Sequence, residues 1–517
     1  MPDSVAVHED ITNLAQFVAR AARERPDHVA LISDHGSASW VELGDRVAAV
    51  AAGLRGLGLT PGDRVAVALP NSIEWATGFF GALAADLVAV PLNPAYTSAE
   101  LTRLLADSGA RVLLGSPEVH EATSALDTPG HRYVVGGTHP SARPYDELAA
   151  TPGERTEPQR GGDDLAALLY TSGTSGRPRA AMLSHRALIA NTAQLADLRP
   201  PPLGPDDVVL LALPLFHAFG LGPGLLAIAR HAATGVLVDR FDAAVSLATI
   251  ARSDVTTVLG VPAMYVAWSR QPEFADQFRA VRLAACGAAP LTAETRAALT
   301  EAGVDSPFEG YGLTETAPAV TSTLASPRPK PGSVGRPIPG VELRLVGADG
   351  LPMSTEDSEN DENASPGTDP GEVWVRGDNL FSGYWPDGAD GPDPEGWWPT
   401  GDIGYLDDDG DLFLVDRIGE LILVSGFNVY PREVESALAG HPAVREAAVV
   451  GVPHELTGEA VKAFVVASGV SEEDLIEHCR TSLASFKCPV AVEFVERLPH
   501  SATGKVRKTA LRTGDDG

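Results

Sequence analysis

Cysteine is scarce in this chain of 517 residues. It occurs at three widely separated positions, Cys286, Cys479 and Cys488. An odd and scattered set of this kind argues against a disulfide framework and against a cysteine-based zinc site. We therefore expect reduced thiols, as in the cytoplasm.

Long apolar runs are also absent. The longest candidate, residues 221–238, is interrupted by Pro223, Arg230 and His231, so it predicts a buried helix and strand and no membrane span. Residues 1–14 carry no basic segment followed by an apolar one, so no secretory signal is predicted. Both observations favour a cytoplasmic protein without an integral membrane segment.

Basic residues are too few to balance the acidic ones, and the formal net charge is −30. This charge argues against nucleic acid or an anionic membrane as the main partner, although a local loop can still bind a nucleotide. Hydrophobic residues make up 44% of the chain, which is enough to fill large cores. A chain of this length exceeds one ordinary domain.

The strongest chemical signal runs from Leu168 to Leu183, LLYTSGTSGRPRAAML. Small residues let successive backbone N–H groups converge on an anion, and hydroxyl groups add donors. With an apolar strand before it and a helix-like segment after it, the stretch predicts a phosphate-binding loop. A polar surface turn is the alternative. The Ser, Thr and Gly series comprises Thr171, Ser172, Gly173, Thr174, Ser175 and Gly176.

Helix and strand signals alternate along the first part of the chain. They predict two helical stretches within residues 17–57, with Trp40–Leu43 between them. They also predict helix over 72–84 and 99–106 and from about Ser184, and strands at 63–69, 87–90, 111–114, 208–213, 235–238, 256–259 and 281–284. Residues 127–164 lose this period and predict a surface connection. Repeated units of this kind predict an α/β fold with a doubly wound, largely parallel sheet.

The second part of the chain changes character twice. Residues 325–340 are too rich in proline and glycine for regular structure and are followed by antiparallel strands at 341–346 and 372–375. The acidic segment 354–371 between these strands is expected to be disordered. A second change, near Asp416, leads into an α+β pattern that predicts a small separate domain.

Further motifs follow the phosphate loop in a fixed order. They are Gly310–Thr316 (GYGLTET), Thr400–Asp402 (TGD), Asp416–Arg417 and Pro499–Lys505 (PHSATGK). With the loop, they resemble the core motifs of the adenylate-forming superfamily, and most closely those of acyl-CoA synthetases and coumarate–CoA-ligase-like enzymes. The resemblance extends from about Leu31 to Arg512.

The resemblance implies a fold and an activity. It implies a large adenylation domain of doubly wound sheets plus a β subdomain (residues 1–417) and a small mobile α+β domain (418–517). Such enzymes form an acyl-adenylate from a carboxylic acid and ATP, and then transfer the acyl group to coenzyme A. The alternatives are an acyl-AMP ligase that loads a separate acyl carrier protein, and a non-catalytic protein that binds acyl-adenylates or nucleotides.

The resemblance also assigns the nucleotide site. It implies that the loop holds the triphosphate and that Glu315 binds Mg²⁺, a hard cation suited to carboxylate oxygens. Lys505 would neutralise the charge that develops as one anion attacks another. The implied AMP-binding residues are the adenine turn Gly287, Ala288 and Ala289, then Tyr311 against the base with Gly312 and Thr314 nearby, and Asp402 and Arg417 on the ribose hydroxyls.

The acid would enter past His217, which the resemblance assigns to positioning of the acid and gating. The implied pocket residues are Phe219, Gly220, Val261, Ala317 and Pro318. Residues 218–223, 260–265 and 316–320 contain no charged side chain, so a charged substrate tail would be buried without a partner. With glycines expected to leave room, we expect a fatty acid of medium or greater length. An aryl or aryl-propenoic acid stacked on Phe219 and Tyr265 is the alternative.

The small domain would bind coenzyme A through Ser425, Gly426 and Phe427 and would turn on a hinge at Gly419. The chain departs from the family pattern at three places. Arg179 and Ala180 replace the usual Lys-Gly, and Gly419 replaces the usual hinge lysine. The acidic segment 354–371 resembles an expanded hairpin loop.

Overall fold

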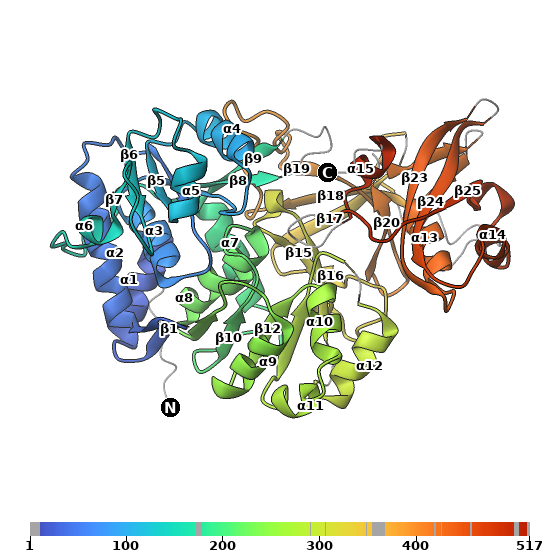
Figure 1. Cartoon of the computed structure of the whole chain (residues 1–517), viewed down its shortest axis with the longest axis horizontal. Coiled ribbons are helices and arrows are strands. Elements are labelled where there is room, and N and C mark those ends of the chain that lie inside the picture. The colour runs from blue at the N-terminus through green and yellow to red at the C-terminus, as the bar shows by residue number, and fades with distance from the viewer. Residues whose placement is uncertain are drawn as a thin grey trace.

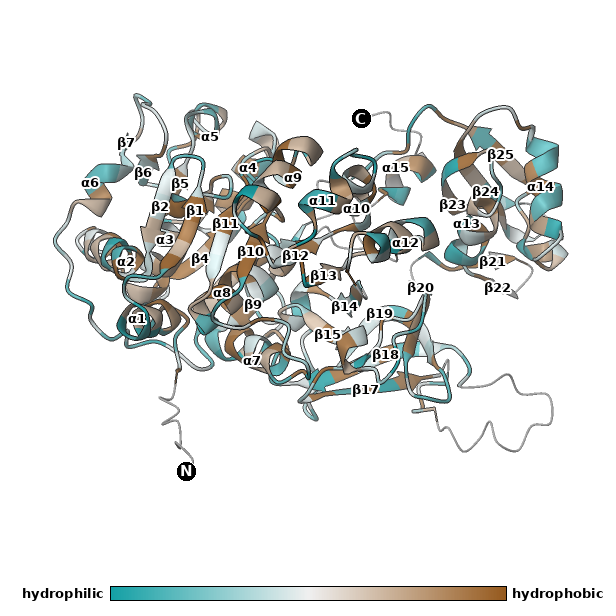
Figure 2. Ribbon diagram, turned by 90° about the horizontal axis from the view of Figure 1, so that it is seen from below, coloured by the Kyte–Doolittle hydropathy of each residue, from teal (hydrophilic) through white to brown (hydrophobic). Residues whose placement is uncertain are grey.

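The computed structural model describes most of the chain. The described residues are 11–171, 178–289, 291–304, 307–347, 349–353, 368–417, 420–424, 427–454, 457–500 and 506–513. Figure 1 shows a large lobe built from about the first four fifths of the chain and a smaller lobe, orange to red, at one end. The two large sheets contain the most apolar strands (Figure 2).

The first sheet has seven strands in the order β7-β6-β5-β3-β4-β8-β9. Its strands are parallel except for the last pair, β8 and β9, which are antiparallel. The strands are β3 (Arg64–Ala68), β4 (Val88–Pro91), β5 (Val112–Gly115), β6 (His131–Val134), β7 (Arg143–Pro144), β8 (Leu165–Thr171) and β9 (Arg179–Ser184). Its helices are α3 (Ile73–Ala84), α4 (Ser98–Ser108), α5 (Pro117–Ala122) and α6 (Tyr145–Ala149).

The second sheet has nine strands in the order β16-β15-β14-β13-β12-β10-β11-β1-β2. Its centre, from β14 to β1, is parallel, and its edges are antiparallel. The strands are β1 (Val29–Ser33), β2 (Gly36–Ser39), β10 (Val208–Leu211), β11 (Thr234–Leu237), β12 (Thr257–Gly260), β13 (Leu283–Cys286), β14 (Phe308–Gly312), β15 (Ala319–Ser322) and β16 (Arg336–Pro337).

Helices lie between and around these sheets. They are α1 (Ala15–Glu24), α2 (Trp40–Arg55), α7 (His185–Ala196), the π-helix η1 (Gly220–Leu226), α8 (Ala227–His231), α9 (Ala243–Arg252), α10 (Pro262–Ser269), α11 (Phe274–Gln277), α12 (Ala293–Glu301) and the short 3₁₀ turns η2 (Thr314–Thr316) and η3 (Thr323–Ala325). Helix α3 contacts β3 and β4 of the first sheet and β1 of the second. One apolar core therefore joins both sheets.

Local sequence sets many helix starts. The hydroxyl groups of Ser72, Thr97 and Ser184 each accept a hydrogen bond from a backbone N–H in the first turn of α3, α4 and α7. Each satisfies a donor that the first turn of a helix leaves without a partner. The predicted doubly wound α/β fold is confirmed, as are the helix and strand predicted within residues 221–238.

Two predicted assignments were wrong, and one strand was missed. The two helical stretches predicted within residues 17–57 are α1 and α2, but the break between them is the β1–β2 hairpin, and Trp40–Leu43 belongs to α2. Residues 127–164 are more than a surface connection, since β6 and β7 extend the first sheet beyond β5. The helix predicted from about Ser184 is confirmed as α7, which begins at His185, but the strand β9 between the phosphate loop and this helix was not predicted.

A four-stranded antiparallel sheet, β17-β18-β19-β20, follows the large sheets. Its strands are β17 (Val341–Val346), β18 (Gly371–Gly377), β19 (Trp397–Leu406) and β20 (Leu412–Arg417). The pairing of β17 with β18 confirms the predicted antiparallel strands. Most of the acidic segment, residues 354–367, lies outside the described residues, so its predicted disorder stays a prediction.

The small lobe has a sheet of its own. It contains β21 (Ile422–Val424), β22 (Phe427–Val429), β23 (Val444–His454), β24 (Gly458–Ala467) and β25 (Ala491–Phe494), with helices α13 (Pro431–Ala439), α14 (Glu472–Arg480) and α15 (Lys508–Thr513) and the 3₁₀ turn η5 (Ser485–Lys487). Its apolar clusters contain only residues from Ile422 onward. None of the described helices in either lobe has the length and apolarity that a membrane span requires.

Candidate active site

The predicted phosphate loop joins β8 to β9. These strands pair from Leu165 opposite Ser184 to Thr171 opposite Arg179, so the loop closes a hairpin at the edge of the first sheet. The Thr171 hydroxyl donates to the carbonyl oxygen of Arg179 at 3.5 Å across the base of the loop. The other predicted phosphate ligands, Ser172, Gly173, Thr174, Ser175 and Gly176, lie outside the described residues.

Glu315, the predicted metal ligand, lies in the short turn η2 just after β14. Its side chain is 6% exposed, and its Oε1 atom accepts a hydrogen bond of 2.6 Å from the hydroxyl of Tyr384. Burial raises the pKa of Tyr384 well above its usual value, and the Glu315 carboxylate adds to the rise. The phenol is therefore protonated at neutral pH and donates this hydrogen bond.

Tyr311 and Asp402, the residues implied for the nucleoside, are in contact. The Tyr311 hydroxyl donates to Oδ2 of Asp402 at 2.7 Å, and both side chains are buried. Asp402 lies opposite Arg417 in the β19–β20 pairing, so the backbones of the two implied ribose ligands are neighbours. Gly401, with φ +74°, turns the chain into Asp402. Residues far apart in the sequence thus meet at one place.

The predicted adenine turn touches the predicted acid pocket. Gly287 follows β13, and a Cβ added to it would lie 2.8 Å from the Phe219 ring, so only glycine lets the ring lie this close. Ala288 has φ +74°, a strained value for a residue with a side chain. Strained backbone of this kind is concentrated at functional sites.

Helix η1 carries the acid-pocket segment against the Glu315 loop. A Cβ on Gly222 would lie 2.9 Å from Cδ of Pro318, and Ala317 has φ +66°. A Cβ on Gly220 would overlap the carbonyl oxygen of Pro214. These glycines therefore permit close backbone packing, and the expectation that they leave room for a substrate was wrong.

His217 and Val261 lie at the starts of two helices near this contact. The carbonyl oxygen of His217 accepts from the N–H of Leu221 at 2.9 Å, and its ring lies 4.8 Å from that of Phe216. Val261 is the residue before helix α10. The packing of η1 on the turns after β13 and β14 thus brings the predicted acid-pocket residues Phe219, Ala317 and Pro318 close to Gly287 of the predicted adenine turn or to each other's segments.

Tyr265 does not face a substrate. It is fully buried, its hydroxyl donates to the carbonyl oxygens of Ala285 at 2.8 Å and Val258 at 3.2 Å, and its ring packs edge-on against Trp268. Its expected stacking on an aryl acid was wrong. Of the two aromatic residues in segments 218–223, 260–265 and 316–320, Phe219 therefore remains the candidate for stacking on an aryl acid.

Two family models match the chain. The model described as "AMP-binding enzyme" matches residues 18–385, and the model described as "AMP-binding enzyme C-terminal domain" matches residues 433–505. The chain belongs to this family. It is therefore an adenylate-forming enzyme of the acyl-CoA synthetase group, and the resemblance inferred from the motifs is confirmed.

Relatives of this family resemble the chain over nearly its full length. A feruloyl-CoA synthase from Amycolatopsis sp. is 37% identical, with 96% of this chain and 98% of the relative covered. A long-chain-fatty-acid–CoA ligase from Yersinia pestis is 35% identical, with 97% and 94% covered. The crystal structure of ATP-bound MatB from Rhodopseudomonas palustris superimposes with a TM-score of 0.87 at 33% identity, covering 97% of this chain and 99% of MatB.

In this AMP-binding enzyme, sequence reasoning missed the side chains that hold the Glu315 loop. Asn379 donates to the carbonyl oxygens of Thr316 at 2.8 Å and Ala319 at 3.2 Å. Asn191 of α7 donates to the Ala319 oxygen at 2.8 Å and accepts from its N–H at 3.1 Å. Both amides are buried, and both lie in segments without a recognised motif. Tyr384 had a weak signal, the aromatic and glycine-containing stretch Phe381–Trp385.

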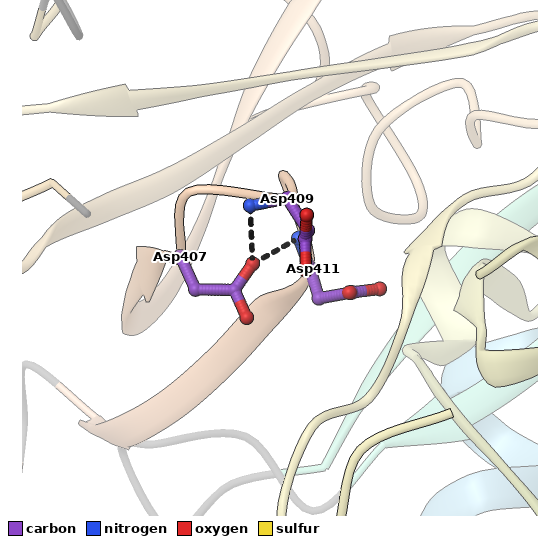
Figure 3. Close-up of side chains that lie close together, drawn as sticks. All are labelled: Asp407, Asp409 and Asp411. Atoms are coloured by element: carbon purple, nitrogen blue, oxygen red, sulfur yellow. Dashed lines mark hydrogen bonds between the residues drawn. The ribbon is translucent and has the colours of Figure 1, made fainter. Parts of the chain in front are cut away.

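Three clustered carboxylates elsewhere do not form the metal site. Asp407, Asp409 and Asp411 close the β19–β20 hairpin, where the N–H groups of Asp409 and Asp411 donate to Asp407 (Figure 3). The ammonium group of Lys330 lies 2.5, 2.6 and 3.3 Å from the three carboxylates. These acids raise the pKa of Lys330. The cluster is therefore a structural ion pair network.

Glu315 fits a magnesium ion better. Its Oε1 atom is held by Tyr384, while its Oε2 atom makes no hydrogen bond or ion pair with any residue that the structure describes. A carboxylate oxygen of a largely buried residue, free of hydrogen bonds and ion pairs to the described residues, is a suitable ligand for a hard divalent cation. When bound, magnesium would neutralise phosphate charge during adenylation.

The predicted functional residues of the small lobe are only partly described. Lys505, Gly419, Ser425 and Gly426 lie outside the described residues, and Phe427 begins strand β22.

The described residues on either side of residues 501–505 are anchored. His500 and Val506 form an antiparallel bridge. The ammonium group of Lys508 lies 2.8 Å from the carboxylates of both Glu420 and Glu435. Burial would lower the pKa of Lys508, but these two carboxylates raise it above its usual value.

Proposed function

We propose that this chain is an ATP-dependent carboxylic acid–CoA ligase. In the first half-reaction a carboxylate oxygen attacks the α-phosphorus of ATP and pyrophosphate leaves. In the second, the sulfur of coenzyme A attacks the acyl carbonyl carbon and AMP leaves. The contact of the Gly287 turn, helix η1 and the Glu315 loop carries this proposal, because an acid and a nucleotide must meet where these elements meet.

Each residue implied by the resemblance has a role in the first half-reaction. The loop from Thr171 to Gly176 would hold the phosphates, and Glu315 would bind Mg²⁺. Asp402 and Arg417 would hold the ribose, with Tyr311 beside the base. Lys505 would bring a compact positive charge to the reacting anions. The buried contact between Tyr311 and Asp402 supports this arrangement.

We propose two domains, residues 1–417 and 418–517, that turn about Gly419 between the half-reactions. The separate apolar clusters of the small lobe support this division. In the second half-reaction Ser425, Gly426 and Phe427 would meet the pantetheine arm of coenzyme A. The few and scattered cysteines favour a cytoplasmic location for the reaction.

The acid is proposed to be apolar, with straight-chain fatty acids as the first class. The segments at Phe219, Val261 and Ala317 contain no charged side chain that could pair with a polar tail. A buried Tyr265 removes one of the two rings expected to stack on an aryl acid. The similarity to a long-chain-fatty-acid–CoA ligase supports this class.

An aryl-propenoic acid is the second candidate. The Phe219 ring lies directly on the Gly287 turn, where it could stack on a flat substrate. The space beside Gly220 and Gly222 of η1 is occupied by neighbouring residues, which reduces the room for a long acyl chain. The similarity to a feruloyl-CoA synthase also supports this candidate.

A substrate screen tests both levels of the proposal. Pyrophosphate release is measured with ATP and Mg²⁺ for straight-chain acids from acetate upward and for cinnamate-type acids. We expect release with apolar acids and thioester formation on adding coenzyme A. With apolar burial worth about 0.8 kcal/mol per methylene, kcat/KM should rise about fourfold per methylene until the pocket is full.

Each other outcome of the screen has a definite meaning. An optimum at acetate or activity confined to aryl acids would refute the fatty acid proposal. Consumption of the adenylate by an acyl carrier protein but not by coenzyme A would refute the CoA ligase. No pyrophosphate release with any acid would refute adenylation itself.

A further inference from the structure

Residues 381–385, here called the bridging segment, connect the Glu315 loop to the strand that leaves the phosphate loop. At one end, the N–H of Phe381 donates to the backbone oxygen of Glu315 at 2.9 Å. At the other end, the N–H of Trp385 donates to the carbonyl oxygen of Ala180 in β9 at 2.9 Å. The segment therefore contacts both elements that are proposed to hold Mg-ATP.

The middle of the bridging segment continues the β9 pairing. The N–H of Met182 donates to the oxygen of Gly383 at 3.0 Å, and the N–H of Ser382 donates to the oxygen of Met182 at 2.9 Å. Gly383 has φ +87°, and an added Cβ would overlap the oxygen of Gly388. A tight turn that only glycine permits thus fixes the backbone of Tyr384.

The side chain of Tyr384 spans the same gap. Its hydroxyl donates to Oε1 of Glu315 at 2.6 Å, while its ring packs edge-on against Phe381. The guanidinium carbon of Arg179, the first residue of β9, lies 3.7 Å from the centre of the Tyr384 ring. One phenol therefore connects the proposed metal ligand to the exit of the phosphate loop.

Arg179 is oriented by a second contact. Its Nη2 atom lies 2.7 Å from Oδ2 of Asp390. The Arg179 and Asp390 side chains are 37% and 70% exposed, so this ion pair contributes little stability by itself. Its effect is to direct a flat guanidinium group onto the Tyr384 ring, a geometry that arginine adopts and that the smaller ammonium group of lysine does not reproduce.

We propose that Tyr384 is the positioning residue for Glu315, and that Arg179 acts through it. The proposal rests on the proposed function, since it concerns how Glu315 is presented to Mg-ATP. With Oε1 held by the phenol, the carboxylate cannot rotate freely and presents Oε2 to the cation as a single ligand atom. Partners that orient a metal ligand in this way commonly change metal affinity by about 10- to 100-fold when they are removed.

Tyr384→Phe is the direct test, because it removes one hydroxyl and keeps the ring under Arg179. Pyrophosphate release is measured as a function of free Mg²⁺ at fixed ATP. We expect the Mg²⁺ concentration for half-maximal rate to rise about 10-fold or more, while the rate at saturating Mg²⁺ falls less than about threefold. A purely structural role would lower the maximal rate and leave the Mg²⁺ midpoint unchanged.

A second readout does not use turnover. Without any acid, bound ATP should raise the melting temperature of the protein, and the difference between ATP with Mg²⁺ and ATP with EDTA then measures the contribution of the metal. That difference should shrink in Tyr384→Phe. Tyr145→Phe is the matched control, because it removes another buried hydroxyl, which is bonded to Thr77 at 2.7 Å. This contact joins helices α6 and α3 beside the first sheet, whereas Glu315 follows β14 of the second sheet (Figure 1). It should leave the difference unchanged.

Arg179→Lys tests the second half of the proposal. It should raise the Mg²⁺ midpoint severalfold in the wild-type background and less than about twofold when added to Tyr384→Phe, because the effect of Arg179 passes through the phenol. Additive effects would overturn the role given to Arg179. Should Tyr384→Phe melt early without ligand, the Mg²⁺ midpoint of Arg179→Lys alone still tests the proposal, because an unchanged midpoint would overturn the role given to Arg179.

The outcomes also separate this proposal from the proposed function. An unchanged Mg²⁺ midpoint and an unchanged melting difference in Tyr384→Phe would overturn the positioning role while adenylation stands. A wild-type protein without pyrophosphate release would refute adenylation. In that case a smaller Mg²⁺-dependent melting difference in Tyr384→Phe would still support the positioning role.

Discussion

Gly222→Ala should damage adenylation through a single added methyl group. Gly222 lies in η1, where a Cβ would be 2.9 Å from Cδ of Pro318 and 3.1 Å from the carbonyl oxygen of Ala317. Neither atom belongs to a flexible side chain, so the backbone after Glu315 must move. Gly224 offers a matched control, because a Cβ there would also find its nearest atom at 2.9 Å, but that atom is the end of the Leu211 side chain.

The expected magnitudes differ because the obstacles differ. Alanine in a helix gains about 1 kcal/mol over glycine, and overpacking of a rigid site costs about 1–3 kcal/mol. In Gly224→Ala the leucine can rotate, so the free energy of unfolding should stay within about 1 kcal/mol of wild type. In Gly222→Ala we expect a net loss of up to about 2 kcal/mol, reduced by a shift of the 317–318 backbone.

That shift is what the activity should report. A displacement of about 1 Å at a reacting site can cost about 100-fold in rate, so a few tenths of an ångström should lower kcat/KM for pyrophosphate release by about 10-fold. Thermal melting and pyrophosphate release are measured for both variants with the best acid. Equal activity losses in the two variants, or full activity in Gly222→Ala, would refute the contact between η1 and the Glu315 loop as a determinant of adenylation.

Three further predictions concern other parts of the chain. Lys505→Ala should abolish pyrophosphate release far more than thioester formation from supplied acyl-AMP, and equal losses would contradict a lysine used in one half-reaction only. Deletion of residues 356–367 should leave activity and melting temperature nearly unchanged, provided that Thr368 remains, because its N–H donates to Leu406 at 2.8 Å. Burial lowers the pKa of His185 to about 4, and its Nδ1 accepts from the N–H of Leu14 at 3.2 Å. The unfolded chain then binds more protons between pH 6.5 and 4, so stability should fall by about 3 kcal/mol as the pH falls through this window. Urea unfolding of wild type and His185→Gln would measure the difference, and identical pH slopes would contradict it.

Much of the fold was predictable because local and long-range signals agree. Asp63–Leu69 and residues 87–90 read as strands in apolar runs between turn residues, and they became β3 and β4. A helix was predicted over residues 72–84, and the Ser72 side chain caps the start of α3 there. Some site motifs were predictable for another reason, because they place charged or polar residues close to the end of a strand. Glu315, just after β14, is an example.

The failures arose where tertiary pairing overrides local preference. Strand β9 contains Ala180, Ala181, Met182 and Leu183, which favour helix when considered alone. Pairing with β8 on one side and with the bridging segment on the other makes the stretch a strand, because its backbone groups find partners in both directions. Glycines in η1 were misread for a similar reason. A sequence shows a missing side chain but not whether a neighbouring backbone fills the space.

Arg179 shows how far the sequence could go at the site itself. From the sequence, an arginine in place of lysine keeps a positive charge near the phosphates. The structure gives that charge two partners, Asp390 at 2.7 Å and the ring of Tyr384 at 3.7 Å, at positions 211 and 205 residues further along the chain. No spacing rule connects positions so far apart, because the contact depends on a strand-like addition to β9 that has no periodic signal. Arg179 therefore does more than keep the charge of the lysine it replaces. In our proposal its planar guanidinium packs on the Tyr384 ring and so affects Glu315 through the phenol.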